Sequence, residues 1–182
     1  MMFSCKVNNM CQKYGKHVGD VEGKAMFSFP EVAVLAKDGM EEELRNLNFG
    51  YRAKYIHQSA KLVQQNGGPE WLNGLRKLSY EETVKELMTL PGVGRKVADC
   101  IALFSMVRTT SKDSFSDHFF HRTQDKPESV PVDTHIWQIA TRDYALVAAN
   151  KTLTDRIYLS IASLFRNLYG PYAGWANTVR VA

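Results

Sequence analysis

Apolar residues recur along most of the chain at steps of three and four, the spacing that places side chains on one face of an α-helix. The predicted helices cover Tyr51–Gln65, a segment from Pro69 through Leu75, Ser79 to near Pro91, Gly94 to about Met106, a run after Asp133, Ile157–Leu168 and Tyr172–Ala182. No stretch alternates apolar and polar residues for long enough to predict a β-sheet. The sequence therefore predicts an all-α fold.

Local signals for helix ends support these boundaries. Ser79 and Glu82 form a capping box, in which each side chain can bond the backbone amide of the other residue. Asp133 is typical of an N-cap residue, because its carboxylate can accept hydrogen bonds from the first free amides of a helix. The pair Gly170-Pro171 is expected to end the last long helix.

Chain length and one irregular segment define the domain organisation. The 182 residues match the usual size of one domain, so we expect a single helical domain over residues 1–182 with two lobes. Residues 107–124 are polar and aperiodic, and they predict an inserted surface loop. Asp117, His118 and His121 in this loop resemble a metal cluster, but the absence of a second such cluster argues against zinc.

Composition narrows the class of protein. The chain is 45% hydrophobic and 23% charged, which is enough for a buried core and argues against disorder. It contains no run of eighteen apolar residues, so we expect no membrane partner. The three cysteines include no CxxC pair, which argues against a disulfide framework and a four-cysteine metal site. A net charge of +4 permits an anionic partner without requiring one.

The segment Leu90-Pro91-Gly92-Val93-Gly94-Arg95-Lys96 is the most informative in the chain. Two glycines at alternate positions free the backbone amides ahead of a helix, and such amides bind phosphate well. A glycine-rich turn that only links two helices would have the same spacing. The spacing alone leaves both interpretations open.

Lys96 is expected in the first turn of the following helix, where the positive end of the helix dipole disfavours an ammonium and favours a neutral, nucleophilic amine. Cys100 and Phe104 follow at i+4 and i+8, so one side of this helix presents an amine, a thiol and an aromatic ring. That side could form a pocket for a flat base. A solvated lysine beside ordinary core residues would give the same pattern.

Asp133 and His135 lie at the start of another predicted helix. An aspartate that caps a helix stays ionised, because the capping amides stabilise its charge, and an ionised aspartate can serve as a base. His135 in the first turn could bind a phosphate. A plain N-cap and a surface histidine are the simpler alternatives for these two residues.

Three motifs together resemble a known family. LPGVGRKVADC (Leu90–Cys100), VPVDTH (Val130–His135) and GPYAGW (Gly170–Trp175) are similar to segments of the eukaryotic 8-oxoguanine DNA glycosylases. These enzymes are members of the helix-hairpin-helix glycosylase superfamily. The resemblance extends through Phe49–Tyr55 and covers nearly the whole stretch from about Asn9 to Val179. It implies the helix-hairpin-helix glycosylase fold, here without the antiparallel β domain with which the family begins.

The resemblance implies roles for residues in each motif. Lys96 corresponds to the amine that attacks C1′ of the damaged nucleotide, and Asp133 to its acidic partner. The residues that correspond to backbone-phosphate contacts are Gly92, Gly94 and His135. Tyr51 corresponds to the residue that wedges beside the vacated stack, and Arg52 to one that contacts the opposite base. An enzyme of this kind flips the nucleotide out of the duplex.

The resemblance also implies a base pocket and a metal ion. The positions that correspond to the base pocket are Cys100, Phe104, Asn177 and Val181. At the last two the family has glutamine and phenylalanine, so this chain departs from the family pattern there. The backbone carbonyls of Met88, Leu90 and Val93 correspond to those that hold a structural metal ion in the hairpin. No cofactor is expected for the chemistry itself.

The expected function is base-excision repair. A bifunctional DNA glycosylase and AP lyase would remove 8-oxoguanine opposite cytosine through a lysine Schiff base and β-elimination. Its expected partner is double-stranded DNA containing the lesion. A monomer in the nucleus is expected, with the mitochondrion as the second compartment. The alternative is a catalytically impaired, truncated isoform that acts as a DNA-binding or interaction module. A purely structural helical bundle would require Lys96 and Asp133 both to be accidents.

Overall fold

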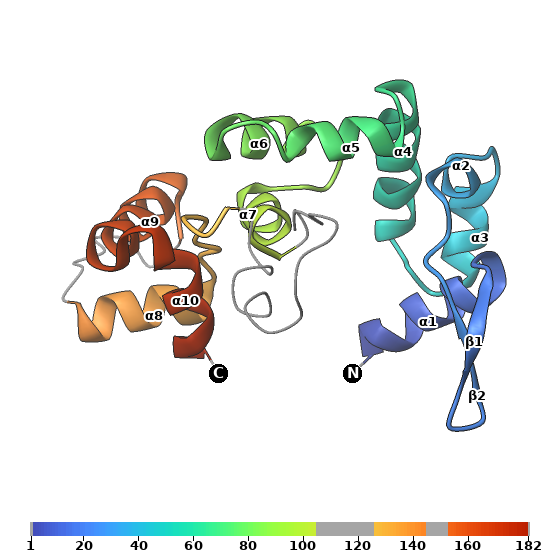
Figure 1. Ribbon diagram of the computed structural model, residues 1–182, viewed down its shortest axis with the longest axis horizontal. Coiled ribbons are helices and arrows are strands. Elements are labelled where there is room, and N and C mark those ends of the chain that lie inside the picture. Colours follow the sequence, from blue (N-terminus) through green and yellow to red (C-terminus); the bar gives the residue numbers. More distant parts are fainter. Residues whose placement is uncertain (1, 105–125, 145–152, 182) are drawn as a thin grey trace, which may run out of the picture. The chain divides into compact units, whose positions relative to one another are not determined.

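A computed structural model describes residues 2–104, 126–144 and 153–181 (Figure 1). The predicted loop at 107–124, with Asp117, His118 and His121, lies outside these residues. The chain divides into two compact units. The N-terminal unit comprises Met1–Gly74 and Leu90–Gly92, and the C-terminal unit comprises Leu75–Thr89 and Val93–Ala182.

The N-terminal unit is a helical layer with one small β-hairpin. Its elements are α1 (Met2–Tyr14), β1 (His17–Val21), β2 (Lys24–Phe27), α2 (Val32–Leu35), α3 (Met40–Asn46), α4 (Arg52–Gln65) and most of α5 (Pro69–Leu75). Apolar residues from α1 through α4 form its core, namely Met10, Leu35, Met40, Leu44, Phe49, Ala53 and Ala60. The helix predicted at 51–65 and the helix start at Pro69 are confirmed.

The hairpin formed by β1 and β2 was not predicted from the sequence. Its strands pair in antiparallel fashion, and most of their residues are exposed, so they lack the alternation that marks a half-buried strand. The turn residues Glu22 and Gly23 have φ values of 50° and 75°. Positive φ at both central residues is the signature of the tight turn that suits a hairpin. The turn, rather than any hydrophobic pattern, therefore identifies this hairpin.

The C-terminal unit contains the remaining helices, α6 (Tyr80–Leu87), α7 (Arg95–Phe104), α8 (Thr134–Asp143), α9 (Asp155–Tyr169), the 3-10 helix η1 (Gly170–Tyr172) and α10 (Ala173–Val181). The predicted capping box is present, because Ser79 and Glu82 each bond the other's backbone amide. Asp133 caps α8 as predicted. The core of the C-terminal unit lies mainly among α8, α9 and the segment before α8. Its buried residues are Val130, Val132, Ile136, Ala140, Tyr158, Ile161, Ala162, Phe165 and Ala173.

Helix α7 packs with a different face from the one its large apolar residues indicate. Ala98, Ala102 and Leu103 are fully buried, whereas Val97 is 44% exposed and Phe104 is 50% exposed. The spacing of Val97, Ile101 and Phe104 predicted the helix correctly. However, these larger residues lie on a partly exposed face of α7. The closely packed face carries the small residues Ala98 and Ala102 together with Leu103.

The glycine of the GPYAGW motif has a packing role in the same unit. A Cβ atom on Gly174 would lie 2.4 Å from the carbonyl oxygen of Ser129 and 2.5 Å from a methyl carbon of Leu103. The Gly174 amide also donates a 2.7 Å hydrogen bond to the carbonyl of Pro127. Only glycine allows α10 to approach the segment before α8 so closely.

Candidate active site

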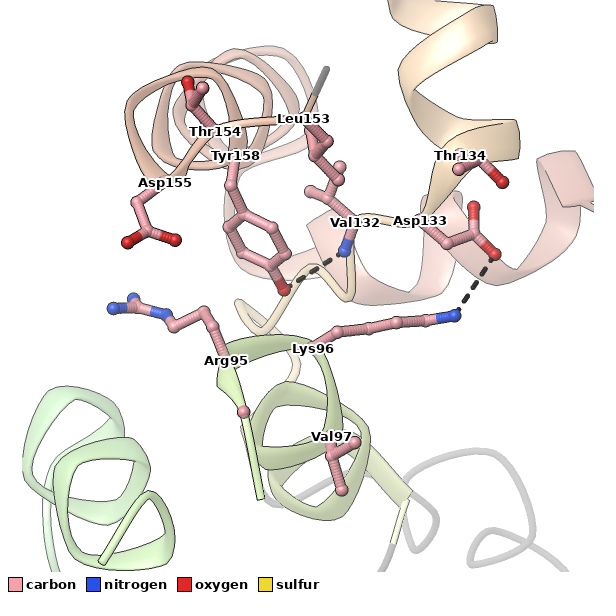
Figure 2. Close-up of a pocket in the computed structure, with 11 residues that line it drawn as sticks. Arg95, Lys96, Val97, Val132, Asp133, Thr134, Leu153, Thr154, Asp155 and Tyr158 are labelled. Atoms are coloured by element: carbon pink, nitrogen blue, oxygen red, sulfur yellow. Dashed lines mark hydrogen bonds and ion pairs between the residues drawn. The ribbon is translucent and has the colours of Figure 1, made fainter. Parts of the chain in front are cut away.

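A groove of about 410 Å³ opens in the C-terminal unit where α7, α8 and α9 begin (Figure 2). Its walls include Lys96 from α7 and Asp133 from the N-cap of α8, two of the predicted site residues. Leu153 and Thr154 contribute from the start of α9. The groove is formed by the first turns of three helices, which lie far apart in the sequence.

The structure brings Lys96 and Asp133 together. The Nζ atom of Lys96 lies 3.5 Å from the Oδ2 atom of Asp133, and the lysine side chain extends from α7 toward the carboxylate (Figure 2). The side chain of Lys96 is 52% exposed and that of Asp133 is 25% exposed. An amine and a carboxylate thus meet in a groove that is open to solvent.

Asp133 is held in the ionised form by its surroundings. Partial burial is the largest single influence and would raise the pKa of Asp133, but hydrogen bonds from the Ile136 and His135 amides, together with the Lys96 charge, outweigh it. The pKa of Asp133 therefore lies below its usual value. The Oδ1 atom accepts both amides, at 2.9 Å from Ile136 and 3.0 Å from His135, so Oδ2 faces the lysine.

Cys100, His135 and Asn177 are not among the residues that line the groove. The thiol of Cys100 is half-buried, and its pKa is raised, mainly by desolvation, so the thiol is neutral near pH 7. The imidazole of His135 is exposed in the first turn of α8. Asn177 is buried and donates a 3.4 Å hydrogen bond to the carbonyl of Pro131, while its Oδ1 atom has no partner among the described residues. The side chain of Val181 lies outside the described residues.

Gly92 lies in the turn between α6 and α7, belongs to the N-terminal unit and packs there against α4. Its φ is +79°, and a Cβ atom at this position would lie 2.7 Å from the ring of Tyr55. The hydroxyl of Ser59 also donates a 3.0 Å hydrogen bond to the carbonyl of Pro91. Gly94 differs from Gly92, because no atom lies within 4 Å of its would-be Cβ.

Tyr51 and Arg52 lie at the start of α4 in the same unit. The Tyr51 ring is exposed, and the guanidinium of Arg52 lies over it at 4.9 Å from the ring centre. The rings of Tyr51 and Tyr55 meet edge to face at 6.1 Å, so the predicted wedge residue contacts the residue that packs on Gly92.

The metal ion predicted at the hairpin stays a prediction. Met88 and Val93 belong to the C-terminal unit and Leu90 to the N-terminal unit, so the convergence of their carbonyl oxygens is not described. Among the described residues, no cluster of three or more His, Cys, Asp or Glu side chains could hold a metal ion.

Asp99, Tyr158 and Arg95 were not predicted as site residues. Arg95 and Tyr158 line the groove, and Asp99 accepts a hydrogen bond from the Tyr158 hydroxyl. Asp99 is fully buried in α7, where it accepts hydroxyl hydrogen bonds from other segments. One signal could have revealed it. A carboxylate between Ala98 and Ala102, on the closely packed side of a helix, needs internal partners.

A comparison with known families identifies the class of protein. Residues 4–161 match the HhH-GPD superfamily of base excision DNA repair proteins, and the chain belongs to this family.

Two individual relatives and one solved structure are also similar to this chain. The chain is 41% identical to the N-glycosylase/DNA lyase OGG1 of Arabidopsis thaliana over 96% of its own length and 43% of the relative's. It is 32% identical to the N-glycosylase/DNA lyase of Saccharomyces cerevisiae, over 94% of this chain and 47% of that protein. The apo crystal structure of the Clostridium acetobutylicum 8-oxoguanine glycosylase/lyase is similar with a TM-score of 0.70 and 25% identity, over 96% of this chain and 51% of that one.

The chain spans about half the length of these relatives. The comparisons confirm the predicted helix-hairpin-helix glycosylase fold and the family resemblance. Among the residues that the structure describes, no helix has both the length and the apolar character of a membrane span.

Proposed function

We propose that this chain is a bifunctional DNA N-glycosylase and AP lyase that removes 8-oxoguanine opposite cytosine from double-stranded DNA. The observation that supports this most directly is the 3.5 Å approach of the Lys96 amine to the Asp133 carboxylate at the edge of an open groove. An amine and a carboxylate in this arrangement can perform Schiff-base chemistry at a sugar carbon.

Lys96 is the nucleophile in the proposed reaction. Its unprotonated amine attacks C1′ of the flipped nucleotide, the C1′–N bond breaks, and the base leaves with the bonding electron pair. The nitrogen then gives up a proton, the bond between C1′ and the ring oxygen breaks, the ring oxygen takes a proton, and the nitrogen forms an iminium with C1′. Loss of a C2′ proton and of the 3′ phosphate completes β-elimination and nicks the strand. The half-exposed position of Lys96 leaves its amine accessible to such a nucleotide.

Asp133 acts through its charge. Because its pKa lies below the usual value, the carboxylate is ionised near pH 7 and stabilises the positive charge that develops on the sugar as the base departs. In this proposal it also assists the proton transfers at the Lys96 amine, whose Nζ atom lies 3.5 Å from Oδ2. The two capping amides fix the carboxylate, so it need not reorganise during the reaction.

The remaining predicted residues contact DNA or the lesion in this proposal. Tyr51 is exposed and fills the gap left by the flipped nucleotide, while Arg52 contacts the opposite base. Gly92, Gly94 and His135 face backbone phosphates. The neutral thiol of Cys100, with Phe104, Asn177 and Val181, forms the pocket for the base. We further propose that the protein acts as a monomer in the nucleus.

Borohydride trapping tests the chemistry. Duplex DNA containing 8-oxoguanine opposite cytosine is incubated with the chain, and borohydride reduces the Schiff base to a stable covalent adduct. We expect an adduct with the wild type and none with Lys96→Gln. Lys85→Gln is the matched control, because it removes the same charge from an exposed position of α6 in the same unit.

The same assay tests the alternative function. Tight binding of the lesion duplex by wild type, without adduct or strand nicking, would favour a DNA-binding or interaction module over an enzyme. The chain's coverage of about half of its relatives is the observation that keeps this alternative in view. An adduct that persists in Lys96→Gln would assign the nucleophile to another amine.

A further inference from the structure

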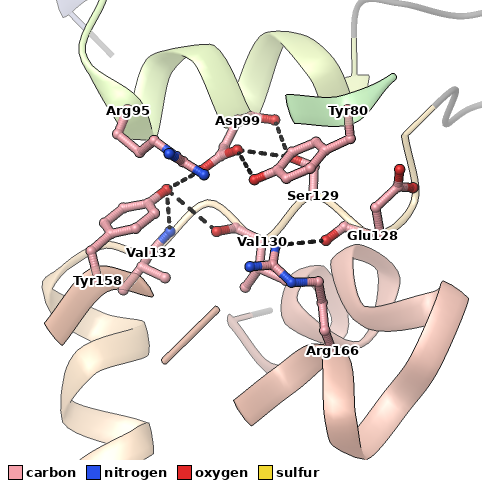
Figure 3. Close-up of polar contacts among 9 residues, drawn as sticks. All are labelled: Tyr80, Arg95, Asp99, Glu128, Ser129, Val130, Val132, Tyr158 and Arg166. Carbon is pink, nitrogen blue, oxygen red and sulfur yellow. Dashed lines mark hydrogen bonds and ion pairs between the residues drawn. The ribbon is translucent and has the colours of Figure 1, made fainter. Parts of the chain in front are cut away.

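A buried carboxylate lies one helical turn beyond the proposed nucleophile. Asp99 is three residues after Lys96 in α7 and is completely buried. Its carboxylate accepts hydrogen bonds from the hydroxyls of Tyr80 at 2.6 Å, Ser129 at 3.2 Å and Tyr158 (Figure 3). These three donors come from α6, from the segment before α8 and from α9. Asp99 therefore links α7 to α6, to the segment before α8 and to α9.

The hydroxyl of Tyr158 extends this link to the other proposed catalytic residue. Besides donating to Asp99, it accepts a 3.1 Å hydrogen bond from the backbone amide of Val132. Val132 immediately precedes Asp133. A continuous path thus runs from α7, which holds Lys96, through Asp99 and the Tyr158 hydroxyl to the backbone that holds Asp133 (Figures 2 and 3).

The Tyr158 hydroxyl is the donor in its hydrogen bond to Asp99. Burial is the main cause that raises the pKa of Tyr158, and Asp99 adds to it. The hydroxyl therefore stays protonated and donates a hydrogen bond to the carboxylate. Its oxygen is then available to accept the Val132 amide. A carboxylate removed from water needs such donors, and the guanidinium of Arg95, with Nε 3.7 Å from Oδ2, adds an opposite charge.

We propose that Asp99 and Tyr158 are positioning residues that set the separation between Lys96 and Asp133. This inference rests on the proposed function, since it concerns the same pair of residues. Asp99 is completely buried, and the Tyr158 hydroxyl is already bonded to Asp99 and to the Val132 amide. They fix two backbone segments, one on each side of the groove, so that the amine and the carboxylate face each other. A displacement of about 1 Å in such a pair can reduce a rate by about 100-fold.

The chain offers a matched pair of variants for the test. Tyr158→Phe and Tyr80→Phe each remove one hydroxyl from the same carboxylate. Only the Tyr158 hydroxyl continues to the Val132 amide, whereas Tyr80 connects Asp99 to α6. A general loss of packing would affect both variants alike. Loss of the path between Lys96 and Asp133 would affect Tyr158→Phe alone.

Single-turnover excision of 8-oxoguanine from a duplex, with the fraction of active enzyme titrated separately, gives the first measurement. We expect Tyr158→Phe to lower the rate constant of the active fraction about tenfold with duplex affinity unchanged, and Tyr80→Phe to stay within about twofold. Equal rates in the two variants would overturn the inference. A loss confined to the active fraction, with the rate constant preserved, would assign Tyr158 a structural role only and would also overturn it.

The pKa of Asp133, followed by NMR with carboxyl-labelled aspartate, gives a measurement that needs no activity. The charged or titratable groups that act on Asp133 are Lys96 and Cys100 of α7 and His135 of its own helix. If Tyr158 maintains the approach of Lys96, Tyr158→Phe raises the pKa of Asp133 toward the value found in Lys96→Gln, and Tyr80→Phe leaves it unchanged. An unchanged value in Tyr158→Phe would contradict the inference.

These measurements separate the two proposals. If wild type neither excises the base nor forms an adduct, the proposed function fails, and the pKa of Asp133 alone decides the inference. If wild type is active and both tyrosine variants match it, the inference fails and the function stands. Should Tyr158→Phe not fold, hydrogen exchange of the Val132 amide in wild type decides. Slow exchange supports the bond to Tyr158, and exchange at the rate of an exposed amide overturns it.

Discussion

The two carboxylate oxygens of Asp133 face different groups. One oxygen accepts the first amides of α8, and the other faces the amine of Lys96. Structural and chemical roles are therefore compatible at this position, and the simple N-cap interpretation does not exclude a catalytic one. The same double use makes the stability of the fold sensitive to the protonation of this residue.

We expect Asp133 to stabilise the fold at neutral pH and to lose this effect in acid. Its folded-state pKa is depressed, so its contribution is present above the unfolded value of about 3.9 and disappears as pH falls through the folded value. Urea denaturation of wild type and Asp133→Asn between about pH 6 and pH 3 measures it. The difference in unfolding free energy should shrink as pH falls, and parallel curves would contradict the assignment.

Gly92 and Gly94 have different tolerances although they belong to one motif. Gly92→Ala places a side chain at φ +79° and against the Tyr55 ring, so we expect it to cost at least about 1–2 kcal/mol of stability. Gly94→Ala meets open space and should stay within about 0.5 kcal/mol. Thermal denaturation compares them. A destabilised Gly94→Ala would show that its position is more crowded than described.

At the level of helices, the sequence predicted well where a local signal was sufficient. Ser79 with Glu82 and Asp133 mark helix starts, because capping depends only on residues a few positions apart. The hairpin at β1 and β2 was not predicted, because glutamate rarely adopts the positive φ that Glu22 has in the turn. The proximity of Lys96 to Asp133 could be predicted only through the family resemblance.

The partners of Asp99 could not be predicted, because they come from three segments between 19 and 59 residues away. Hydrophobic spacing shows which residues belong to a helix, but Val97 and Phe104 indicated the open face of α7 rather than the packed one. Side-chain volume explains the difference. Ala98 and Ala102 are fully buried, whereas Val97 and Phe104 stay about half exposed, and Val97 lines the groove.

The two faces of α7 give a prediction at this scale. Leu103→Ala removes a fully buried side chain that contacts the start of α10, so we expect a loss of about 2–5 kcal/mol. Val97→Ala, on the exposed face, should change stability by less than about 0.5 kcal/mol. Chemical denaturation measures both. Similar losses in the two variants would mean that α7 is buried on both sides.

At the scale of the whole molecule, the chain passes between the two units more than once. The hairpin residues Leu90–Gly92 belong to the N-terminal unit, while α6 before them and α7 after them belong to the C-terminal unit. Each unit has its own core, around Leu44 in one and Ile161 in the other. Because the turn at Leu90–Gly92 belongs to one unit and the helices on both sides of it to the other, its folding depends on both units. We therefore propose that residues 1–182 form one cooperative domain.

The tryptophans allow this proposal to be tested. Trp71 lies in the N-terminal unit, and Trp137 and Trp175 lie in the C-terminal unit. Fluorescence of Trp71→Phe reports on the C-terminal unit, and that of the double variant Trp137→Phe/Trp175→Phe reports on the N-terminal unit. In one cooperative domain both probes give the same transition.

Core substitutions then complete the test. Leu44→Ala and Ile161→Ala each remove a fully buried side chain, at an expected cost of about 2–5 kcal/mol. In one domain, each substitution lowers the denaturation midpoint reported by both probes, because the hairpin cannot keep its contacts with α4 while α6 and α7 unfold. If Leu44→Ala shifts only the Trp71 signal and Ile161→Ala only the other, the units fold independently and the chain contains two domains.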